Sequence, residues 1–459
     1  MRRRNSRESG GFFGAFFLVI LLFVLGISYF VYSSDMFERN VPKVSLGDKI
    51  NWNLKTPINV SITDDTGIKS LKISLSDGKQ VVNLIDETFE LIQKELNLAI
   101  NLPKGTLLDR NGNFKLNIEV KDISKWKFGN KLSKEIDVLV DTKRPDVYIL
   151  NQSYKITKGG SGAVVFKASD DNLNEVYIQT SFGKKFEVVP FYKDGYFVSI
   201  IAWPVNQKNF TAYAVATDKA GNESKVRIRY YLQDKTYKTS KISLTDEFIN
   251  GKISELVEIY AKDPSIYEGI EKFKFVNETL RNTNEELIYS KTDKILEEKV
   301  DDFFIKPFYP LKNGAAVASF GDHRFYVKDN KDVSQSWHLG LDLASVANAQ
   351  ITTSNPAVVV LKADNGIYGL NLVLYHGLGL YSIYGHCSAS SVEVGQNISE
   401  EEVIANTGSS GLAFGDHLHF GMSVQGVEVR PEEWMDKKWM KENIFQILDN
   451  AKKLIDNKK

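Results

Sequence analysis

Histidine is distributed unevenly along this sequence. All six histidines lie in the last third of the chain, and two closely spaced pairs stand out among the polar residues there. His338 and Asp342 occur in SWHLGLDLAS, and His417 and His419 occur in GDHLHFG. Imidazoles and carboxylates are common zinc ligands, and three such ligands with one open water position describe a catalytic zinc site. The pattern therefore favours metal-dependent chemistry in this part of the chain.

Strand geometry would bring each pair to one side of a sheet. The glycine at position 340 and the alternating pattern argue against a helix, and successive residues of a strand point to opposite faces. We therefore expect His338, Gly340 and Asp342 to share one side of a strand. His417 and His419 should share one side of another, a spacing by which β structure brings two imidazoles into one site.

Three ordered motifs, HLGLD, YGH and HLHF, resemble those of the lysostaphin-type (LytM domain) metallopeptidases. The likeness covers roughly Phe320 to Met435 and extends to SFGDHR before the first motif and NTGSSGLAFGDHLHF at the last. It implies a LytM-type peptidase domain that cuts the peptide part of bacterial peptidoglycan. It also implies Zn²⁺ as the cofactor, held by His338, Asp342 and His419.

The same resemblance assigns catalytic roles to His386, in YGH, and to His417. These roles are activation of the zinc-bound water and stabilisation of the charged intermediate. Zinc lowers the pKa of bound water toward about 7 and polarises the scissile carbonyl, which leaves proton transfer and oxyanion support to nearby imidazoles. Histidine suits both tasks near neutral pH. The spacing leaves open which of the two is the general base.

The remaining histidines and the cysteine have simpler interpretations. His376, in YHGLG, is expected in a hairpin turn between two strands, with a surface or turn role. His323, in GDHR, is either a surface residue or a substrate contact at the edge of the groove. Cys387 directly follows His386, and adjacent strand residues point to opposite faces. We therefore expect a buried, inert thiol and no Cys-His nucleophile.

The N-terminal segment has the composition of a membrane span. An uncharged run from Gly11 to Tyr32 is long enough, at about 1.5 Å per residue, to cover a hydrocarbon core of ~30 Å. Four arginines precede it: Arg2, Arg3, Arg4 and Arg7. They predict a cytoplasmic N-terminus and an exported chain after Ser33. The alternative is a cleaved signal peptide, whose apolar region would be about 7 to 15 residues long and followed by a small-residue cleavage site, which SYFVYSSD fits poorly.

The exported part is predicted to be mainly β. Turn signals such as Asp77-Gly78 and Asp194-Gly195 separate short alternating segments, as in β-hairpins. ITDDTGIKSLKISLSDGK resembles KASDDNLNEVYIQTSFGK, which begins about one hundred residues later. This repeat predicts two tandem β-sandwich modules of immunoglobulin-like type, at 41–144 and 145–240. Neither contains a catalytic cluster, so we interpret them as spacers or as docking arms for cell-shape or division proteins.

Three segments complete the predicted architecture. Apolar residues at helical spacing, such as Phe248 and Val257, predict a helical connector at 241–300, which either links domains or packs on the next one. Glycine-punctuated strands predict an antiparallel β peptidase domain at 308–435. An amphipathic C-terminal helix at 436–459 caps that domain or touches a membrane with its basic face. Residues 1–35 are the cytoplasmic tail and anchor.

The net charge and the predicted cellular location limit the classes of function that we expect. The 58 basic side chains are matched by 58 acidic ones, so nothing favours nucleic acid as a partner. The anchor and the resemblance together predict a single-pass protein of the bacterial inner membrane with its catalytic domain in the periplasm. We expect a zinc-dependent peptidoglycan endopeptidase that hydrolyses cross-links or stem peptides. The alternatives are a catalytically inactive LytM-type regulator that activates a cell-wall amidase, and an interaction scaffold.

Overall fold

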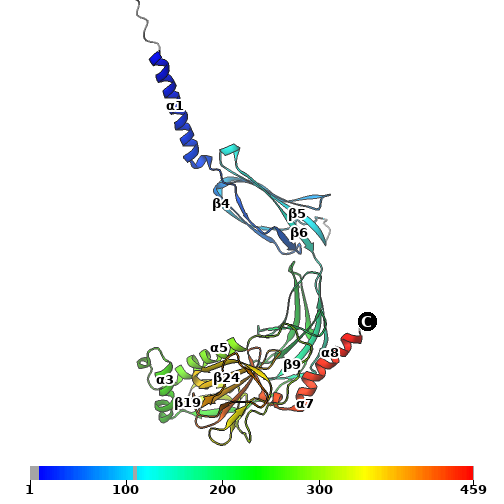
Figure 1. Ribbon diagram of the computed structural model, residues 1–459, viewed down its shortest axis with the longest axis vertical. Helices are drawn as coiled ribbons and strands as arrows, with labels where there is room; N and C mark the ends of the chain where they lie inside the picture. Colours follow the sequence, from blue (N-terminus) through cyan, green and yellow to red (C-terminus); the bar gives the residue numbers. More distant parts are fainter. Residues whose placement is uncertain (1–9, 107–110, 458–459) are drawn as a thin grey trace, which may run out of the picture. The chain divides into compact units, whose positions relative to one another are not determined.

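The computed structural model describes residues 10–106 and 111–457, which form two compact units (Figure 1). The first unit extends to Arg144 and includes the short segment Asp218–Asn222; the second holds Pro145–Thr217 and Glu223 onward. Most regular structure in both units is strand, so the prediction of a mainly β protein is confirmed. The boundaries of the individual domains stay predictions.

The N-terminal apolar segment is a helix, α1 (Gly10–Ser33). Among the described residues, Phe13–Ser33 is the one helical stretch that is long and apolar enough to cross a membrane, with a mean hydropathy of 2.6. Its side chains are exposed rather than buried in a protein core. A helix that is apolar on every side and packs against no protein suits a lipid environment. The four arginines that should orient it (Arg2, Arg3, Arg4 and Arg7) lie outside the described residues.

Six strands of the first unit form a single sheet, whereas we expected two sheets packed as a sandwich. The strands are β1 (Lys43–Ser45), β2 (Lys49–Trp52), β3 (Ile58–Ser76), β4 (Val81–Ile100), β5 (Asn111–Asp122) and β6 (Lys131–Asp141). Strand β3 joins both halves, because its residues up to Thr63 pair with β1 and those from Ile68 onward pair with β5. Its alternating Val60, Ile62, Ile73 and Leu75 are buried in the core of this sheet.

Two four-stranded sheets begin the second unit and share one hydrophobic core. One contains β7 (Asp146–Gln152), β9 (Ser161–Ser169), β12 (Val189–Pro190) and β13 (Tyr196–Ala202). The other contains β10 (Leu173–Thr180), β11 (Lys185–Glu187), β14 (Ala212–Asp218) and β15 (Glu223–Ile228). This is the layered arrangement expected of a β-sandwich. A short parallel pair is formed by β8 (Lys155–Thr157), which lies between β7 and β9 in the chain, and β16 (Tyr231–Gln233), which follows β15.

The predicted helical connector packs on the peptidase sheet, which decides between the two interpretations of this segment. Its α-helices are α2 (Asp246–Phe248), α3 (Ser254–Tyr260), α4 (Ile270–Lys274) and α5 (Arg281–Thr292), with wider turns at Ile249–Ile253 and Phe275–Leu280. Val257 and Val276 of the connector share a buried cluster with Val373 and Ile383 of the sheet. The connector therefore shares a hydrophobic core with this sheet.

An eight-stranded antiparallel sheet forms the centre of the peptidase region. Its strands are β18 (Ala315–Ala318), β21 (Leu341–Ala344), β23 (Ala357–Asp364), β24 (Leu370–Tyr375), β25 (Leu380–Cys387), β27 (Asn397–Ile398), β29 (Leu418–Val424) and β30 (Val427–Val429). The same region also contains two three-stranded sheets. One consists of β17 (Thr239–Ser243), β19 (His323–Lys328) and β20 (Lys331–Trp337), and the other of β22 (Gln350–Thr352), β26 (Ala389–Ser390) and β28 (Val403–Asn406).

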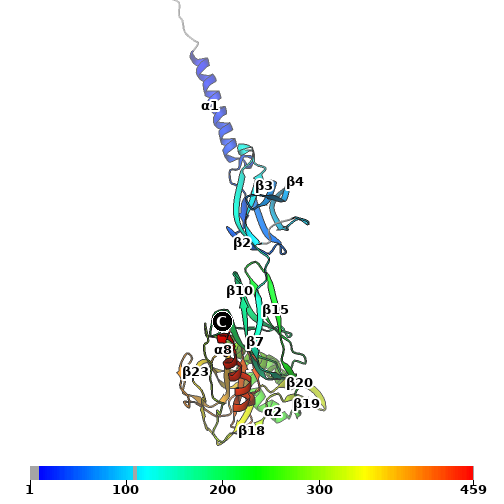
Figure 2. The ribbon, with the colours of Figure 1, turned by 90° about the vertical axis from the view of Figure 1, so that its right-hand side faces the viewer.

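The C-terminal helices pack on the neighbouring β module within the same unit. They are α6 (Pro431–Met435), α7 (Lys437–Met440) and α8 (Gln446–Asn457), and α8 packs against β7 and β9, beside β7 in Figure 2. Asn151 Nδ2 donates a hydrogen bond to the Ile447 carbonyl at 2.8 Å, and Ser153 Oγ donates one to the Asn443 carbonyl at 2.7 Å. The apolar face of this segment is therefore covered by protein, which favours the capping role.

Candidate metal centre

Asp342 and His419 face each other on neighbouring strands. Strands β21 and β29 are antiparallel, and their register pairs Asp342 directly with His419. Their neighbours along each strand are buried in the hydrophobic core: Leu341, Leu343, Leu418 and Phe420. Because strand residues alternate between faces, Asp342 and His419 must point to the opposite face. His417, immediately before β29, projects into the same cavity, as its spacing of two from His419 predicted.

His338 reaches this point from a loop, so the prediction that it shares a strand with Asp342 is wrong. Strand β20 ends at Trp337 and β21 begins at Leu341. The His338 backbone N–H donates to the Asp322 carbonyl at 2.9 Å, and the His338 carbonyl accepts from Gly321 at 2.7 Å. Its Nδ1 lies 2.9 Å from the Ser319 carbonyl, so an N–H there leaves Nε2 free to bind a metal.

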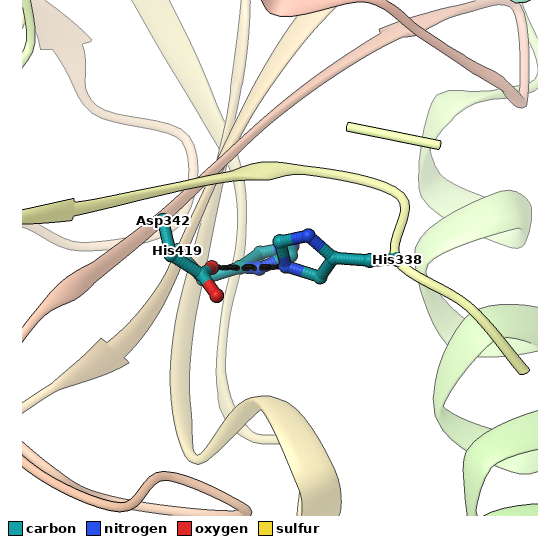
Figure 3. Close-up of side chains that lie close together, drawn as sticks. All are labelled: His338, Asp342 and His419. Carbon is teal, nitrogen blue, oxygen red and sulfur yellow. Dashed lines mark hydrogen bonds and ion pairs between the residues drawn. The ribbon is translucent and has the colours of Figure 1, made fainter. Parts of the chain in front are cut away.

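The three predicted ligands converge on one point (Figure 3). Asp342 Oδ1 lies 3.0 Å from His338 Nε2 and 3.0 Å from His419 Nδ1, and the two nitrogens are 3.3 Å apart. Their side chains are 7%, 13% and 8% exposed for His338, Asp342 and His419. Two imidazoles and a carboxylate at such separations fit zinc, and three protein ligands leave a coordination position for water or substrate.

Protonation in this cluster also suits a cation. Burial raises the pKa of Asp342, but its hydrogen bonds with His338 and His419 outweigh burial and hold that pKa well below its usual range. Burial lowers the pKa of His419 despite the contact with Asp342. The carboxylate is therefore ionised and the imidazole is neutral near pH 7. These are the forms that coordinate a metal.

The two predicted catalytic histidines lie beside the ligands. The His386 ring centroid is 4.7 Å from that of His417 and 5.9 Å from that of His419. His417 Nε2 lies 3.9 Å from Asp342 Oδ2. In each ring Nδ1 is 2.8 Å from a backbone carbonyl, that of Ser410 for His386 and that of Gly415 for His417. An N–H donated to each carbonyl leaves Nε2 as the basic nitrogen of both rings.

His386 has an unusual backbone for a strand residue. Its φ is +62°, in the left-handed region, and the β24–β25 register shifts between Leu370 and Leu372. A β-bulge of this kind re-aims a side chain, and strained backbone is often found at functional sites. Burial lowers the pKa of His386 to about 3, so the ring is neutral at physiological pH. The next residue, Cys387, is fully buried as predicted, and burial raises the pKa of its thiol to about 12.

The other two histidines lie outside the cluster. His376 is in the turn between β24 and β25, as predicted, and its side chain is buried there, with 8% of it exposed. Its Nε2 lies 2.7 Å from Ser382 Oγ, and burial lowers the pKa of His376 to about 4. His323 stacks on Trp337 with ring centroids 4.1 Å apart. His323 is not among the described residues that line the cavity around the cluster.

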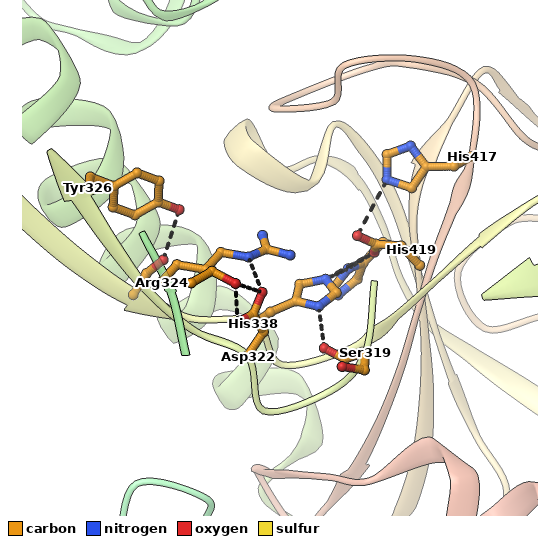
Figure 4. A network of polar contacts seen from close by, with 10 residues as sticks. Ser319, Asp322, Arg324, Tyr326, His338, His417 and His419 are labelled. Atoms are coloured by element: carbon orange, nitrogen blue, oxygen red, sulfur yellow. Dashed lines mark hydrogen bonds and ion pairs between the residues drawn. The ribbon is translucent and has the colours of Figure 1, made fainter. Parts of the chain in front are cut away.

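A cavity of about 860 Å³ contains all five predicted site residues. Residues of β17, β19 and the connector also line it, such as Ser240, Phe248 and Arg324. Figure 4 shows Arg324 beside His338. Sequence reasoning missed Tyr368, whose ring lies 5.5 Å from that of His419, and it missed Ser319 and Ser410 as carbonyl acceptors. Backbone acceptors carry no sequence signal. Arg324 does lie in the SFGDHR segment noted above.

Gly340 should prove essential to the ligand geometry, because the chain passes over His419 at this point. A Cβ added at Gly340 would lie 2.4 Å from His419 Cε1 and 3.0 Å from the Phe420 carbonyl oxygen. We expect Gly340→Ala to displace the imidazole and to weaken zinc binding by about 10- to 100-fold, the usual effect of disturbing ligand orientation. Competition with a chelator measures this. Gly251→Ala, whose added Cβ meets no atom within 4 Å, is the control and should bind zinc normally.

Comparison with known proteins identifies the family of the segment that contains the cluster. Residues 336–431 match the family model described as Peptidase family M23. This segment is an M23 peptidase domain. All five clustered residues lie inside the M23 domain, whereas Ser319, Asp322 and Arg324 lie before it.

Relatives of the M23 domain differ in what they do. The chain is 30% identical over 140 residues to the DD-carboxypeptidase/endopeptidase Mpg of Neisseria meningitidis, a match that covers 30% of each protein. It is 37% identical over 70 residues to the murein hydrolase activator EnvC of Escherichia coli, which covers 15% of this chain and 17% of that protein. A solved M23 peptidase from Pseudomonas aeruginosa is 18% identical, with a TM-score of 0.39, over 61% of this chain and 95% of that one. The matches to the curated relatives span only part of the relatives' length, 30% or 22% for the Mpg proteins.

Proposed function

We propose that this chain is a zinc-dependent endopeptidase that hydrolyses peptide cross-links or stem peptides of bacterial peptidoglycan. The observation that carries the proposal is the convergence of His338, Asp342 and His419, with His386 and His417 beside them, in one cavity. The family match supports the reaction class. The substrate class is motivated by the relative whose name describes a DD-carboxypeptidase/endopeptidase.

The ligand atoms in this proposal are His338 Nε2, Asp342 Oδ1 and His419 Nδ1. Zinc bound there supplies Lewis-acid polarisation of a peptide carbonyl and acidification of water. Nε2 of one neighbouring imidazole, His386 or His417, accepts a proton from the attacking water. The other, when protonated, donates a hydrogen bond to the carbonyl oxygen as negative charge develops there. Their Nδ1 contacts to backbone carbonyls hold both rings in the required tautomer.

A specific observation favours a second candidate, a regulator that activates a cell-wall amidase, because the chain resembles the activator EnvC. Full-length protein in detergent, incubated with purified peptidoglycan, separates the two. An endopeptidase releases products with new peptide termini, which mass spectrometry detects, and zinc removal stops their release. A regulator releases nothing alone and increases product only when an amidase is added.

We further propose a single-pass inner-membrane protein with the M23 domain in the periplasm, where the β modules contact cell-shape or division proteins. The apolar helix α1 and the peptidoglycan-acting relative support this location. Basic residues beside a first span stay in the cytoplasm, so Arg2 to Arg7 should remain inside.

The topology makes a direct prediction. A reporter that works only in the periplasm should be active when fused after Lys459, and a reporter that works only in the cytoplasm should be inactive there. The measurement is reporter activity in intact cells, normalised to fusion abundance. Replacing all four arginines with glutamate is the control and should reduce periplasmic activity. A fully active cytoplasmic reporter after Lys459 would overturn the topology.

A further inference from the structure

The wall of the catalytic cavity opposite the M23 domain is rich in cations. Four basic residues line it, and all four precede the M23 match: Lys238, Lys241, Arg281 and Arg324. The acidic residues of the cavity lining are Asp322, Asp342 and Asp416. Asp342 belongs to the metal-binding set, and Asp416 accepts hydrogen bonds from Thr407 and the Asn348 backbone. The wall before the M23 domain therefore carries excess positive charge toward the cavity.

Arg324 is held at one edge by a buried carboxylate. Its Nε lies 3.4 Å from Asp322 Oδ2. The Asp322 side chain is only 6% exposed, and both its oxygens accept from Ser240 Oγ, at 2.8 and 3.0 Å. The Asp322 backbone carbonyl also accepts the N–H of His338. Arg324 is thus anchored through the same short segment that holds a metal ligand in position.

The anchoring uses one edge of the guanidinium and leaves the other free. In the part of the chain that the structure describes, Nη1 and Nη2 of Arg324 have no hydrogen-bond or ion-pair partner. The guanidinium extends from β19 toward the imidazoles of His338 and His419 (Figure 4), and its side chain is 24% exposed. The planar end of a guanidinium matches the two oxygens of a carboxylate.

Arg281, by contrast, is already engaged. Its Nε and Nη2 donate to Asn277 Oδ1 at 3.2 and 3.1 Å, and its Nη1 lies 3.8 Å from Glu285. Lys238 and Lys241 are exposed, and each offers only a flexible point charge. Arg324 is therefore the residue of this wall that is built to recognise a planar anion.

We propose that Arg324 binds a carboxylate of the substrate peptide end-on, and so makes the enzyme select peptides that carry a free carboxylate near the scissile bond. This inference rests on the proposed endopeptidase function and names the chemistry of its substrate. Arg324 is a specificity-determining residue, and Asp322 and Ser240 position it. Loss of a charge-assisted, bidentate contact of this kind lowers kcat/KM by about 10- to 100-fold.

The test compares two substrates on full-length enzyme. One is a purified cross-linked muropeptide with free carboxylates, and the other is the same muropeptide after chemical amidation of those carboxylates. Wild-type protein should cleave the free form 10- to 100-fold more efficiently. Arg324→Gln should lose that preference by slowing cleavage of the free form alone, and Arg324→Lys should recover part of it. Lys331→Gln, which removes an exposed cation from neighbouring β20 outside the cavity, should behave as wild type.

Two further readouts keep the outcomes distinct. Zinc content should be unchanged in Arg324→Gln, and calorimetric binding of the free muropeptide to His417→Ala protein should weaken when Arg324→Gln is added. An equal slowing of both substrates by Arg324→Gln would overturn the inference, since Arg324 would then act on the chemistry. Equal cleavage of both substrates by wild-type protein would also overturn it. Cleavage of neither substrate by wild-type protein would instead contradict the proposed function.

Discussion

His419→Ala is expected to abolish stoichiometric zinc binding and, with it, detectable peptidoglycan hydrolysis. In the proposed site His419 is one of three protein ligands, and its Nδ1 is 3.0 Å from Asp342 Oδ1 at the centre of the cluster. Two remaining ligands hold zinc poorly, and removal also leaves Asp342 without one of the two imidazoles that keep its pKa low. The measurement is zinc per chain by elemental analysis, together with product release from purified peptidoglycan.

His323→Ala provides the matched control for this prediction. It removes an imidazole from the same region. This imidazole stacks on Trp337 and is not among the described residues that line the cavity. It should retain zinc and hydrolysis. If folded His419→Ala protein kept one zinc per chain, the assignment of His419 as a ligand would be wrong.

His417→Ala is expected to keep its zinc but to lose about 10²- to 10⁴-fold in hydrolysis. The ligand set is intact in this variant, because His417 Nε2 is 3.9 Å from Asp342 Oδ2 and contributes no ligand atom to the three-residue cluster. What is lost is a proton acceptor or donor at the reacting centre, and such general acid–base help is typically worth that factor. The measurements are zinc content and initial rates of product release.

His386→Ala should give the same separation of zinc content from hydrolysis. Its ring lies 4.7 Å from that of His417 and is held by the Ser410 carbonyl. The pH dependence of the two residual rates would then distinguish the general base from the group that supports the oxyanion. If both variants lost zinc as completely as His419→Ala while remaining folded, the division between ligands and catalytic histidines would be contradicted.

The alternation of apolar and polar residues predicted the positions of the two proposed ligands that lie on strands. Alternation along β21 and β29 places Asp342 and His419 on one face because their neighbours are apolar and buried. His338 could not be placed in this way, since its position depends on the carbonyls of Ser319 and Asp322, which are distant in sequence. Spacing alone suggested a strand there, and the loop was missed.

Long-range contacts explain the remaining differences in the fold. Nothing in the local pattern of β3 indicates that its two halves pair with different strands and join the first module into one sheet. The second module shares a buried hydrophobic cluster with the peptidase region, and buried polar contacts add to it, such as the Ser161 N–H that donates to Glu433 Oε2 at 3.0 Å. Neither residue has a sequence signature for this contact, so the modules look independent until the chain is folded.

The most direct test of the account is an anomalous diffraction map collected at the zinc absorption edge from crystals of zinc-supplemented protein. The account predicts one strong peak within coordination distance of His338 Nε2, Asp342 Oδ1 and His419 Nδ1, at about 2.0 to 2.2 Å from each atom. The peak should be absent from His419→Ala crystals. A fully ordered cluster without a peak, or a peak held by other residues, would contradict it.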